Sequence, residues 1–271
     1  MRHRGVLIGV ALMLLGVTPA LAEDDPRLSL STSVNYSVGD YGAGKDTTIV
    51  YVPFTLGVSP LNRLWLDVTV PFIHQTTQNV IITGGGVASR KEEKGKLARP
   101  ARSTTEAGLG DVLFKVSYIV LEDIVPEDRG PIPEIAPYVK IKFPTADEHR
   151  GLGTGEFDET VGVDVSKRLV DGLFGYLSLA YTFIGSPAGS DLRDAFGWSV
   201  GAAYAVSQPF SVFAFLDGAT AIAPGQENPL ELGVGAEFKL PGALKLTGAI
   251  SRGLSKGSED WGVSAGLAVR F

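Results

Sequence analysis

The chain ends in Trp261-Gly262-Val263-Ser264-Ala265-Gly266-Leu267-Ala268-Val269-Arg270-Phe271, a stretch with almost uninterrupted alternation. Successive side chains of a β-strand point to opposite faces. The odd-numbered residues from Trp261 to Phe271 therefore share one face, which suits hydrocarbon, whereas the other face is small or charged. We expect a strand that separates an apolar environment from a polar one.

The same alternation recurs upstream, in segments of about ten residues separated by turn residues, as in strands of a membrane β-barrel. For the segment 210–221 the alternation does not decide which face is the inner one, because Asp217 and Ser211 share a parity with Phe213 and Phe215. The twelve predicted strands cover residues 27–38, 47–58, 63–74, 108–121, 134–143, 157–169, 173–184, 193–206, 210–221, 230–240, 243–254 and 261–271.

The N-terminus has the pattern of an export signal. A basic start at residues 2–4 precedes an apolar run over 6–17, and a small-x-small pattern predicts cleavage after Ala22. Residues 1–22 are thus expected to be a cleaved signal peptide and residues 23–271 a single domain. A membrane anchor is disfavoured, because the apolar run is shorter than the roughly 20 residues that cross a bilayer.

The composition agrees with an exported β-protein. The chain has 34 glycines, no cysteine and a net charge of −6. Without cysteine, a disulfide framework and a thiolate metal site are excluded, and no basic stripe suggests nucleic acid. After Ala22 no apolar run is long enough for a transmembrane helix, so the 44% of hydrophobic residues point to a soluble β-sandwich or a membrane β-barrel.

The connections favour the barrel. Those after even-numbered strands are mostly tight turns, with 122–133 the exception, whereas those after odd-numbered strands are longer and 75–106 is the longest. An even strand count places both termini on the short-turn side, which is the periplasm in bacterial barrels. Aromatic residues near strand ends, among them Tyr36, Phe72 and Phe174, suit interfacial girdles. We predict an all-β fold, a transmembrane antiparallel up-and-down barrel.

The closing strand resembles the last strand of bacterial outer-membrane barrels, in which a terminal aromatic such as Phe271 is the assembly signal. A second resemblance joins Gly108-Leu109-Gly110-Asp111, Lys142-Phe143-Pro144-Thr145-Ala146-Asp147, Gly151-Leu152-Gly153-Thr154-Gly155 and Tyr181-Thr182-Phe183-Ile184-Gly185. Their order is similar to that of the outer-membrane transporter-like family named for a meta-pathway of phenol degradation. The resemblance implies a barrel for uptake of small, often aromatic or hydrophobic compounds, and it transfers no catalytic residues.

Sites for chemistry are only weakly indicated. The glycine-rich run at 151–155 lacks the Lys-Ser/Thr ending and the following helix of a phosphate loop, so we interpret it as a loop that leads into a strand. His74 and His149 lie near strand ends, where a hydrolase could sit at the barrel rim, but two isolated histidines make a weak metal site. We expect no catalytic residue, metal or cofactor. The conceivable partners of the histidines are Ser103, Asp147 and Asp158.

Charged side chains on the predicted inner faces are better functional candidates. In hydrocarbon, a Lys or Arg near the bilayer midplane costs roughly 2–4 kcal/mol. Inside a barrel such charges can line a wet pore, or they can pair and fill the interior of a closed one. The candidates for lining the lumen are Asp67, Asp111, Lys115, Lys140, Lys142, Asp164, Glu231, Glu237, Lys239, Lys245 and Arg270.

The predicted function is passage of a small, aromatic or hydrophobic compound through a monomeric channel in the bacterial outer membrane, with selectivity from pore width and lumen charge. A closed barrel acting through its extracellular loops and a hydrolase at the rim are the alternatives. Expected partners are outer-membrane lipid and lipopolysaccharide, the barrel assembly machinery and the small-molecule substrate, but no nucleic acid. Basic residues within 90–102 could contact lipopolysaccharide phosphates, although Glu92 and Glu93 favour a solvated loop.

Overall fold

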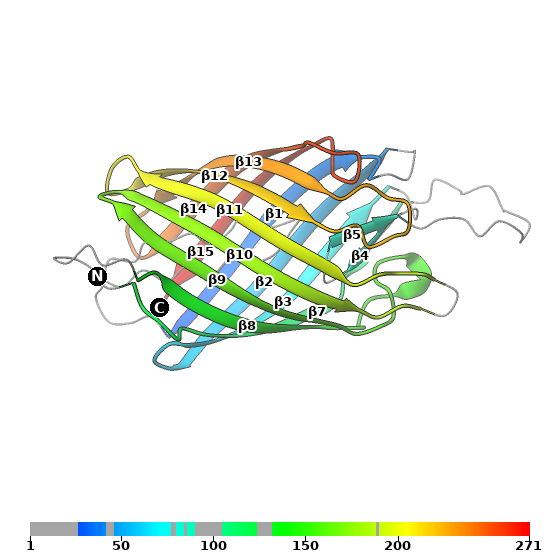
Figure 1. Cartoon of the computed structure of the whole chain (residues 1–271), viewed down its shortest axis with the longest axis horizontal. Coiled ribbons are helices and arrows are strands. Elements are labelled where there is room, and N and C mark those ends of the chain that lie inside the picture. Colours follow the sequence, from blue (N-terminus) through cyan, green and yellow to red (C-terminus); the bar gives the residue numbers. More distant parts are fainter. Residues whose placement is uncertain are drawn as a thin grey trace, which may run out of the picture.

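The chain forms a closed antiparallel barrel of twelve strands, as the sequence predicts (Figure 1). The computed structural model describes residues 27–41, 46–76, 80–83, 86–89, 105–123, 132–187 and 190–271, so the predicted signal peptide and the basic run at 90–102 lie outside the described residues. The barrel strands are β1 (Leu28–Gly39), β2 (Thr47–Leu61), β3 (Leu64–Gln75), β6 (Glu106–Leu109) with β7 (Val112–Tyr118), β8 (Glu134–Phe143), β9 (Asp158–Val170), β10 (Leu173–Ile184), β11 (Ala195–Ala205), β12 (Phe210–Ala219), β13 (Leu230–Lys239), β14 (Leu244–Gly253) and β15 (Trp261–Arg270).

The first and last strands close the barrel. β1 pairs with β15 in continuous antiparallel register from Ser29–Arg270 to Val38–Trp261. The terminal residue extends this seam, because the Phe271 amide donates to the Leu28 carbonyl at 2.9 Å and the Leu28 amide donates to the Phe271 carbonyl at 3.3 Å. This pairing closes the wall into a barrel, which is a condition for placing β-structure in lipid.

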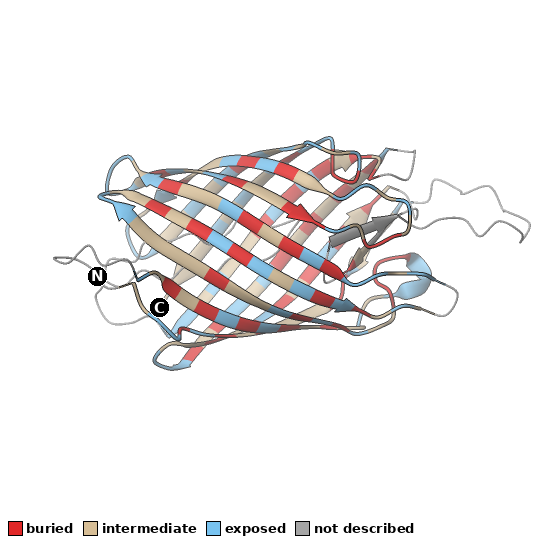
Figure 2. Ribbon diagram, viewed as in Figure 1, coloured by how far each residue is buried: buried red, intermediate tan, exposed pale blue. Residues whose placement is uncertain are grey.

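The two faces of the wall differ as the alternation predicts. Buried and exposed residues alternate along the strands (Figure 2). Large apolar side chains are exposed on the outer face, whereas Ser, Thr, Asn and charged side chains predominate among the buried residues. A soluble protein rarely exposes so continuous an apolar surface. Examples on the outer face are Val34, Phe54, Val68, Phe72, Val139, Val161, Leu179, Val234 and Leu267.

The fourth predicted strand, 108–121, is wrong in its boundaries. It is interrupted between β6 and β7, where Phe72 pairs with Leu109 on one side of the break and Thr69 pairs with Leu113 on the other. One extra residue is therefore accommodated at Gly110-Asp111, which makes this point a bulge in the wall. The Gly110 amide still donates to the Pro71 carbonyl at 2.8 Å.

The structure adds two short elements to predicted connections. The connection predicted at 75–106 contains a hairpin of β4 (Val80–Thr83) and β5 (Gly86–Ser89), and the one between β8 and β9 contains the 3₁₀ helix η1 (Glu148–Arg150). Both lie at the barrel end opposite the start of β1 and the end of β15, and we call this end the mouth (Figure 1). No helix in the described part of the chain is long and apolar enough to cross a bilayer.

The facing of β12, which the sequence leaves open, is now decided. Ser211 and Phe215 are buried and Val212 is exposed, so the phenylalanine parity is the inner one. The prediction that Phe174 belongs to an interfacial girdle is wrong, because this residue faces the interior of the barrel. Its side chain is buried and packs with Phe215 on the inner face.

Candidate functional site

The inner face of the wall carries all the charged candidates. Each lies on the face of its strand opposite to the exposed apolar side chains, or, for Asp111, at the bulge between β6 and β7. Lys239, Lys245 and Arg270, near the end that holds Leu28 and Phe271, are half-buried. That these side chains border a passage stays a prediction. The buried candidates are Asp67, Asp111, Lys115, Lys140, Lys142, Asp164, Glu231 and Glu237.

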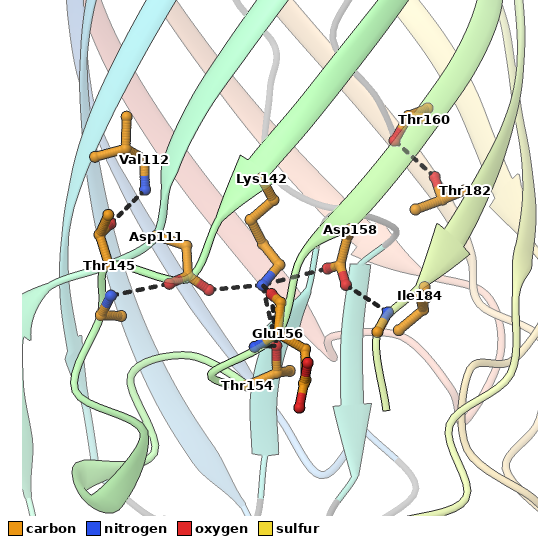
Figure 3. A network of polar contacts seen from close by, with 12 residues as sticks. Asp111, Val112, Lys142, Thr145, Thr154, Glu156, Asp158, Thr160, Thr182 and Ile184 are labelled. Atoms are coloured by element: carbon orange, nitrogen blue, oxygen red, sulfur yellow. Dashed lines mark hydrogen bonds and ion pairs between the residues drawn. The ribbon is translucent and has the colours of Figure 1, made fainter. Parts of the chain in front are cut away.

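Lys142, at the mouth end of β8, is the centre of one charged cluster (Figure 3). Its ammonium donates to Asp111 Oδ2 at 2.8 Å and lies 3.5 Å from Asp158 Oδ2. It also donates to Thr154 Oγ1 at 3.0 Å and to the Glu156 carbonyl at 2.8 Å. The ammonium is thus surrounded by oxygen, as a buried cation requires.

The two carboxylates around Lys142 are engaged on their other sides as well. Asp111 Oδ1 accepts from the Ala146 amide at 2.9 Å, and Asp158 Oδ1 accepts from the Gly185 amide at 3.0 Å. The cluster therefore joins the bulge, the end of β8, the start of β9 and the end of β10.

A second cluster lies further from the mouth. The Lys115 ammonium donates to Asp164 Oδ2 at 3.1 Å and sits 3.9 Å from the centre of the Tyr138 ring. The Ser178 hydroxyl donates to Asp164 Oδ1 at 2.7 Å. Both charges are almost fully buried, with 4% and 7% of the side chains exposed, so they neutralise each other in a region from which water is largely excluded.

The charges near the other end are held less closely. Lys245 Nζ lies 3.9 Å from Glu237 Oε1, and neither of these two atoms has a hydrogen-bond partner among the described residues. Arg270 places its guanidinium 5.8 Å from the centre of the Trp65 ring. Lys245 and Glu237 therefore keep hydrogen-bonding capacity that water or a solute could use.

Glu259 belongs to the inner surface at the mouth, although sequence reasoning did not single it out. It lies in the connection between β14 and β15, is buried, and accepts a hydrogen bond from the Ser251 hydroxyl. Burial raises its pKa above the ordinary value for a glutamate, while the hydroxyls of Ser251 and Ser37 act in the opposite direction. A charged residue in a turn carries no alternation signal, so the pattern could not have placed it.

An aromatic strip on the inner face of β10–β12 was also missed. It consists of Phe174, Tyr176, Phe213 and Phe215, with the Phe215 ring 5.9 Å from both the Tyr176 and the Phe213 rings. A Cβ on Gly201 would lie 2.1 Å from Phe215 Cδ1, and one on Gly235 would lie 2.5 Å from Phe213 Cζ. Glycines opposite phenylalanines on neighbouring strands were the available sequence signal, since such pairs let a ring lie flat on the wall.

The histidines form no hydrolase arrangement in the described part of the chain. His74 shares the outer parity of β3, and the His149 side chain is 91% exposed. Asp147 accepts from the backbone amide of His149, and Asp158 is held by Lys142. The conceivable partner Ser103 lies outside the described residues. Among the described residues no group of three His, Asp or Glu side chains could hold a metal ion.

The sequence matches a known family along most of its length. The model of the family described as "Putative MetA-pathway of phenol degradation" matches residues 46–271. The chain belongs to this family. The family resemblance predicted from the motifs is thereby confirmed. No curated protein matches the chain.

Solved structures share the fold at low sequence identity. An outer-membrane channel from Pseudomonas putida F1 has a TM-score of 0.68 at 14% identity, over 92% of this chain and 97% of that one. The KdgM porin, solved with disordered oligogalacturonate, has a TM-score of 0.54 at 9% identity, over 90% of this chain and 99% of its own. The NanC porin has a TM-score of 0.52 at 10% identity, over 89% of this chain and 100% of its own.

Proposed function

We propose that this protein is an outer-membrane channel that lets small compounds pass through the barrel lumen without a cofactor or a chemical step. The observation that carries the proposal is the inverted polarity of the barrel, which has an apolar outer face and an inner face rich in paired charges and hydroxyls. Such a wall suits a hydrophobic surrounding and a polar interior. The solved structures with the same fold are described as channels and porins.

We also propose aromatic or hydrophobic compounds as the cargo. The family description refers to phenol degradation. The inner strip of Phe174, Tyr176, Phe213 and Phe215 offers ring faces within an otherwise polar wall. Aromatic rings favour other rings in offset or edge-on contact, so the strip would retain a phenolic compound better than a sugar.

The cellular placement follows from the same architecture. The start of β1 and the end of β15 lie at the end opposite the mouth, so the mouth would face the exterior in a bacterial outer membrane (Figure 1). We propose that residues 1–22 are removed on export and that Phe271, which is exposed beside the closing seam, is the signal read by the barrel assembly machinery. Outer-membrane lipid and lipopolysaccharide would surround a single barrel.

A closed barrel that acts through its loops is the second candidate. The charged clusters of β7–β9 favour it, because Lys115 and Lys142 are only 3% exposed and Lys140 is 8% exposed. Ion pairs packed this closely can fill an interior as well as line a pore.

Conductance of the refolded protein, residues 23–271, in a planar bilayer separates the two candidates. A channel gives discrete openings, and a phenol or an aromatic acid that binds in the lumen reduces their current. Replacing Lys245, whose ammonium has no hydrogen-bond partner among the described residues, with Glu should move the reversal potential in a salt gradient toward cation preference. A silent bilayer, with heat-modifiable migration showing a folded barrel, would refute the channel and support the closed barrel.

A further inference from the structure

The glycine-rich motif Gly151-Leu152-Gly153-Thr154-Gly155 has no role in the proposed function so far. It belongs to residues 144–157, the connection between β8 and β9, which we call the inner segment. Lys142 and Asp158 pair across β8 and β9, so a short hairpin turn could join these strands. The connection is much longer than closure of the hairpin requires, and residues 151–154 are buried.

The inner segment folds back against the inside of the wall. Leu152, 2% exposed, packs with Tyr41, Ile49, Tyr51 and Ile73. Ile49, Tyr51 and Ile73 lie on the inner parity of β2 and β3. Because β6–β7 and β3 stand between β8 and β2 in the barrel, the segment reaches across the inner face of these strands.

The glycines around Leu152 make this close approach possible. A Cβ on Gly108 of β6 would lie 2.7 Å from Leu152 Cδ1, and one on Gly153 would lie 2.7 Å from Asp111 Oδ2. Gly151 and Gly155 have φ of 73° and 74°, a backbone region that glycine adopts at little cost. The motif is therefore explained by its fit against the wall, and the loop interpretation from the sequence was incomplete.

Polar contacts fix the inner segment at both ends. Lys142 donates to Thr154 Oγ1 and to the Glu156 carbonyl (Figure 3). Gln75 of β3 donates through Nε2 to the Gly151 carbonyl at 3.0 Å. Arg150 donates to Glu106 at 2.8 Å and to the Ala107 carbonyl at 2.8 Å, which satisfies part of the edge of β6.

The opposite side of the mouth approaches the same cluster. Gln226, in the connection between β12 and β13, donates to the Tyr41 carbonyl at 2.6 Å. Strands β14 and β15 lie between β13 and β1 in the wall. The connection between β12 and β13 therefore reaches past these two strands to Tyr41, which packs with Leu152. Two connections from distant parts of the wall thus meet at the cluster of Tyr41 and Leu152.

We infer that the inner segment, residues 144–157, is the constriction of this barrel and sets the size of the largest molecule that passes. The inference rests on the proposed channel function. Pore diameter is a principal determinant of what a pore admits. Leu152 is the positioning residue that holds the segment against β2 and β3, and Lys142 holds its return to β9.

The experiment compares four proteins in liposome swelling with a neutral monosaccharide, disaccharide and trisaccharide. They are the wild type, a variant with residues 146–155 replaced by Gly-Ser-Gly-Ser, Leu152→Ser, and the control His149→Ser. His149 lies in the same segment, but its side chain is 91% exposed. Heat-modifiable migration verifies that each barrel has folded, and Leu152→Ser keeps the test valid should the replacement fail to fold.

The replacement should admit sugars that the wild type excludes and raise conductance by about two-fold or more, since it widens the narrowest point. Leu152→Ser should raise uptake of the larger sugars less strongly, and His149→Ser should match the wild type. A silent wild type beside a conducting replacement would support the inner segment as the obstruction of the lumen and would support the closed barrel as the function of the intact protein. Unchanged size limits in both variants, or silence in all four proteins, would overturn the constriction.

Discussion

The inner faces of β7–β9 and of β13–β15 both carry charges of either sign, but they hold them differently. On β7–β9 the ion pairs are 2.8–3.5 Å long and are supplemented by hydroxyls and backbone groups. On β13–β15 the pair of Lys245 and Glu237 is 3.9 Å apart, without a hydrogen bond on the facing atoms.

The difference divides the charged candidates into two groups. The charged side chains of β7–β9 stabilise the wall and the inner segment, because their hydrogen-bonding groups already have partners within the barrel. On β13–β15, the facing atoms of Lys245 and Glu237 have no hydrogen-bond partner among the described residues and keep capacity for a passing solute. Selectivity for charge should therefore depend on Lys245 and Glu237, and structural integrity on the ion pairs of β7–β9.

The largest effect should come from breaking a tight pair. Lys115→Met leaves Asp164 buried without its cation, and removal of one partner of a buried pair costs about 3–5 kcal/mol. Urea unfolding of the barrel in detergent, followed by tryptophan fluorescence, measures the change.

Lys245→Met is the matched control on the other wall. It should destabilise the barrel less than Lys115→Met, because its pair is 3.9 Å long without a hydrogen bond between the facing atoms, and Lys239 and Arg270 also act on Glu237. Equal losses in the two variants would remove the distinction between the walls.

A second contrast concerns glycines that face packed or open space. Gly201→Ala should lower the free energy of unfolding by about 1–3 kcal/mol, since the added methyl group meets the Phe215 ring and overpacks the wall. Gly248, on the exposed outer face of β14, has no heavy atom within 4 Å of the Cβ position. Gly248→Ala should be neutral or stabilise by about 0.5 kcal/mol. A neutral Gly201→Ala in the same unfolding assay would mean that the aromatic strip is not rigidly packed.

The smallest effect should be a pH dependence at the mouth. Burial raises the pKa of Glu259, and Glu231, Tyr41, Ser37 and Ser251 surround it. A raised carboxyl pKa gives a contribution to stability that is present at low pH and is lost as pH rises through the folded pKa. The urea concentration at the unfolding midpoint should therefore decrease as the pH is raised from mildly acidic to mildly alkaline. This decrease should be smaller in Glu259→Gln. An identical pH profile in the variant would assign the dependence to other groups.

The sequence predicted the outer face well and the interior only in part. Alternation is strict where side chains meet hydrocarbon, so the strand count and the closing strand at Trp261–Arg270 could be predicted. The facing of β12 could not, because Phe213 and Phe215 depend on Gly235 and Gly201 of neighbouring strands. The position of Leu152 depends on contacts with β2 and β3, which no local pattern encodes.

The seam between β1 and β15 has a consequence for the order of folding. Neighbouring barrel strands elsewhere follow one another along the chain, whereas this pair joins the first and the last strand. The entropy lost on closing a loop grows with its length, so the seam is the last and slowest contact to become favourable. Until Phe271 reaches Leu28, the edges of β1 and β15 are unpaired and open to pairing with other chains. A folding factor that assists barrel closure would need to bind the edges of both β1 and β15 and bring them together.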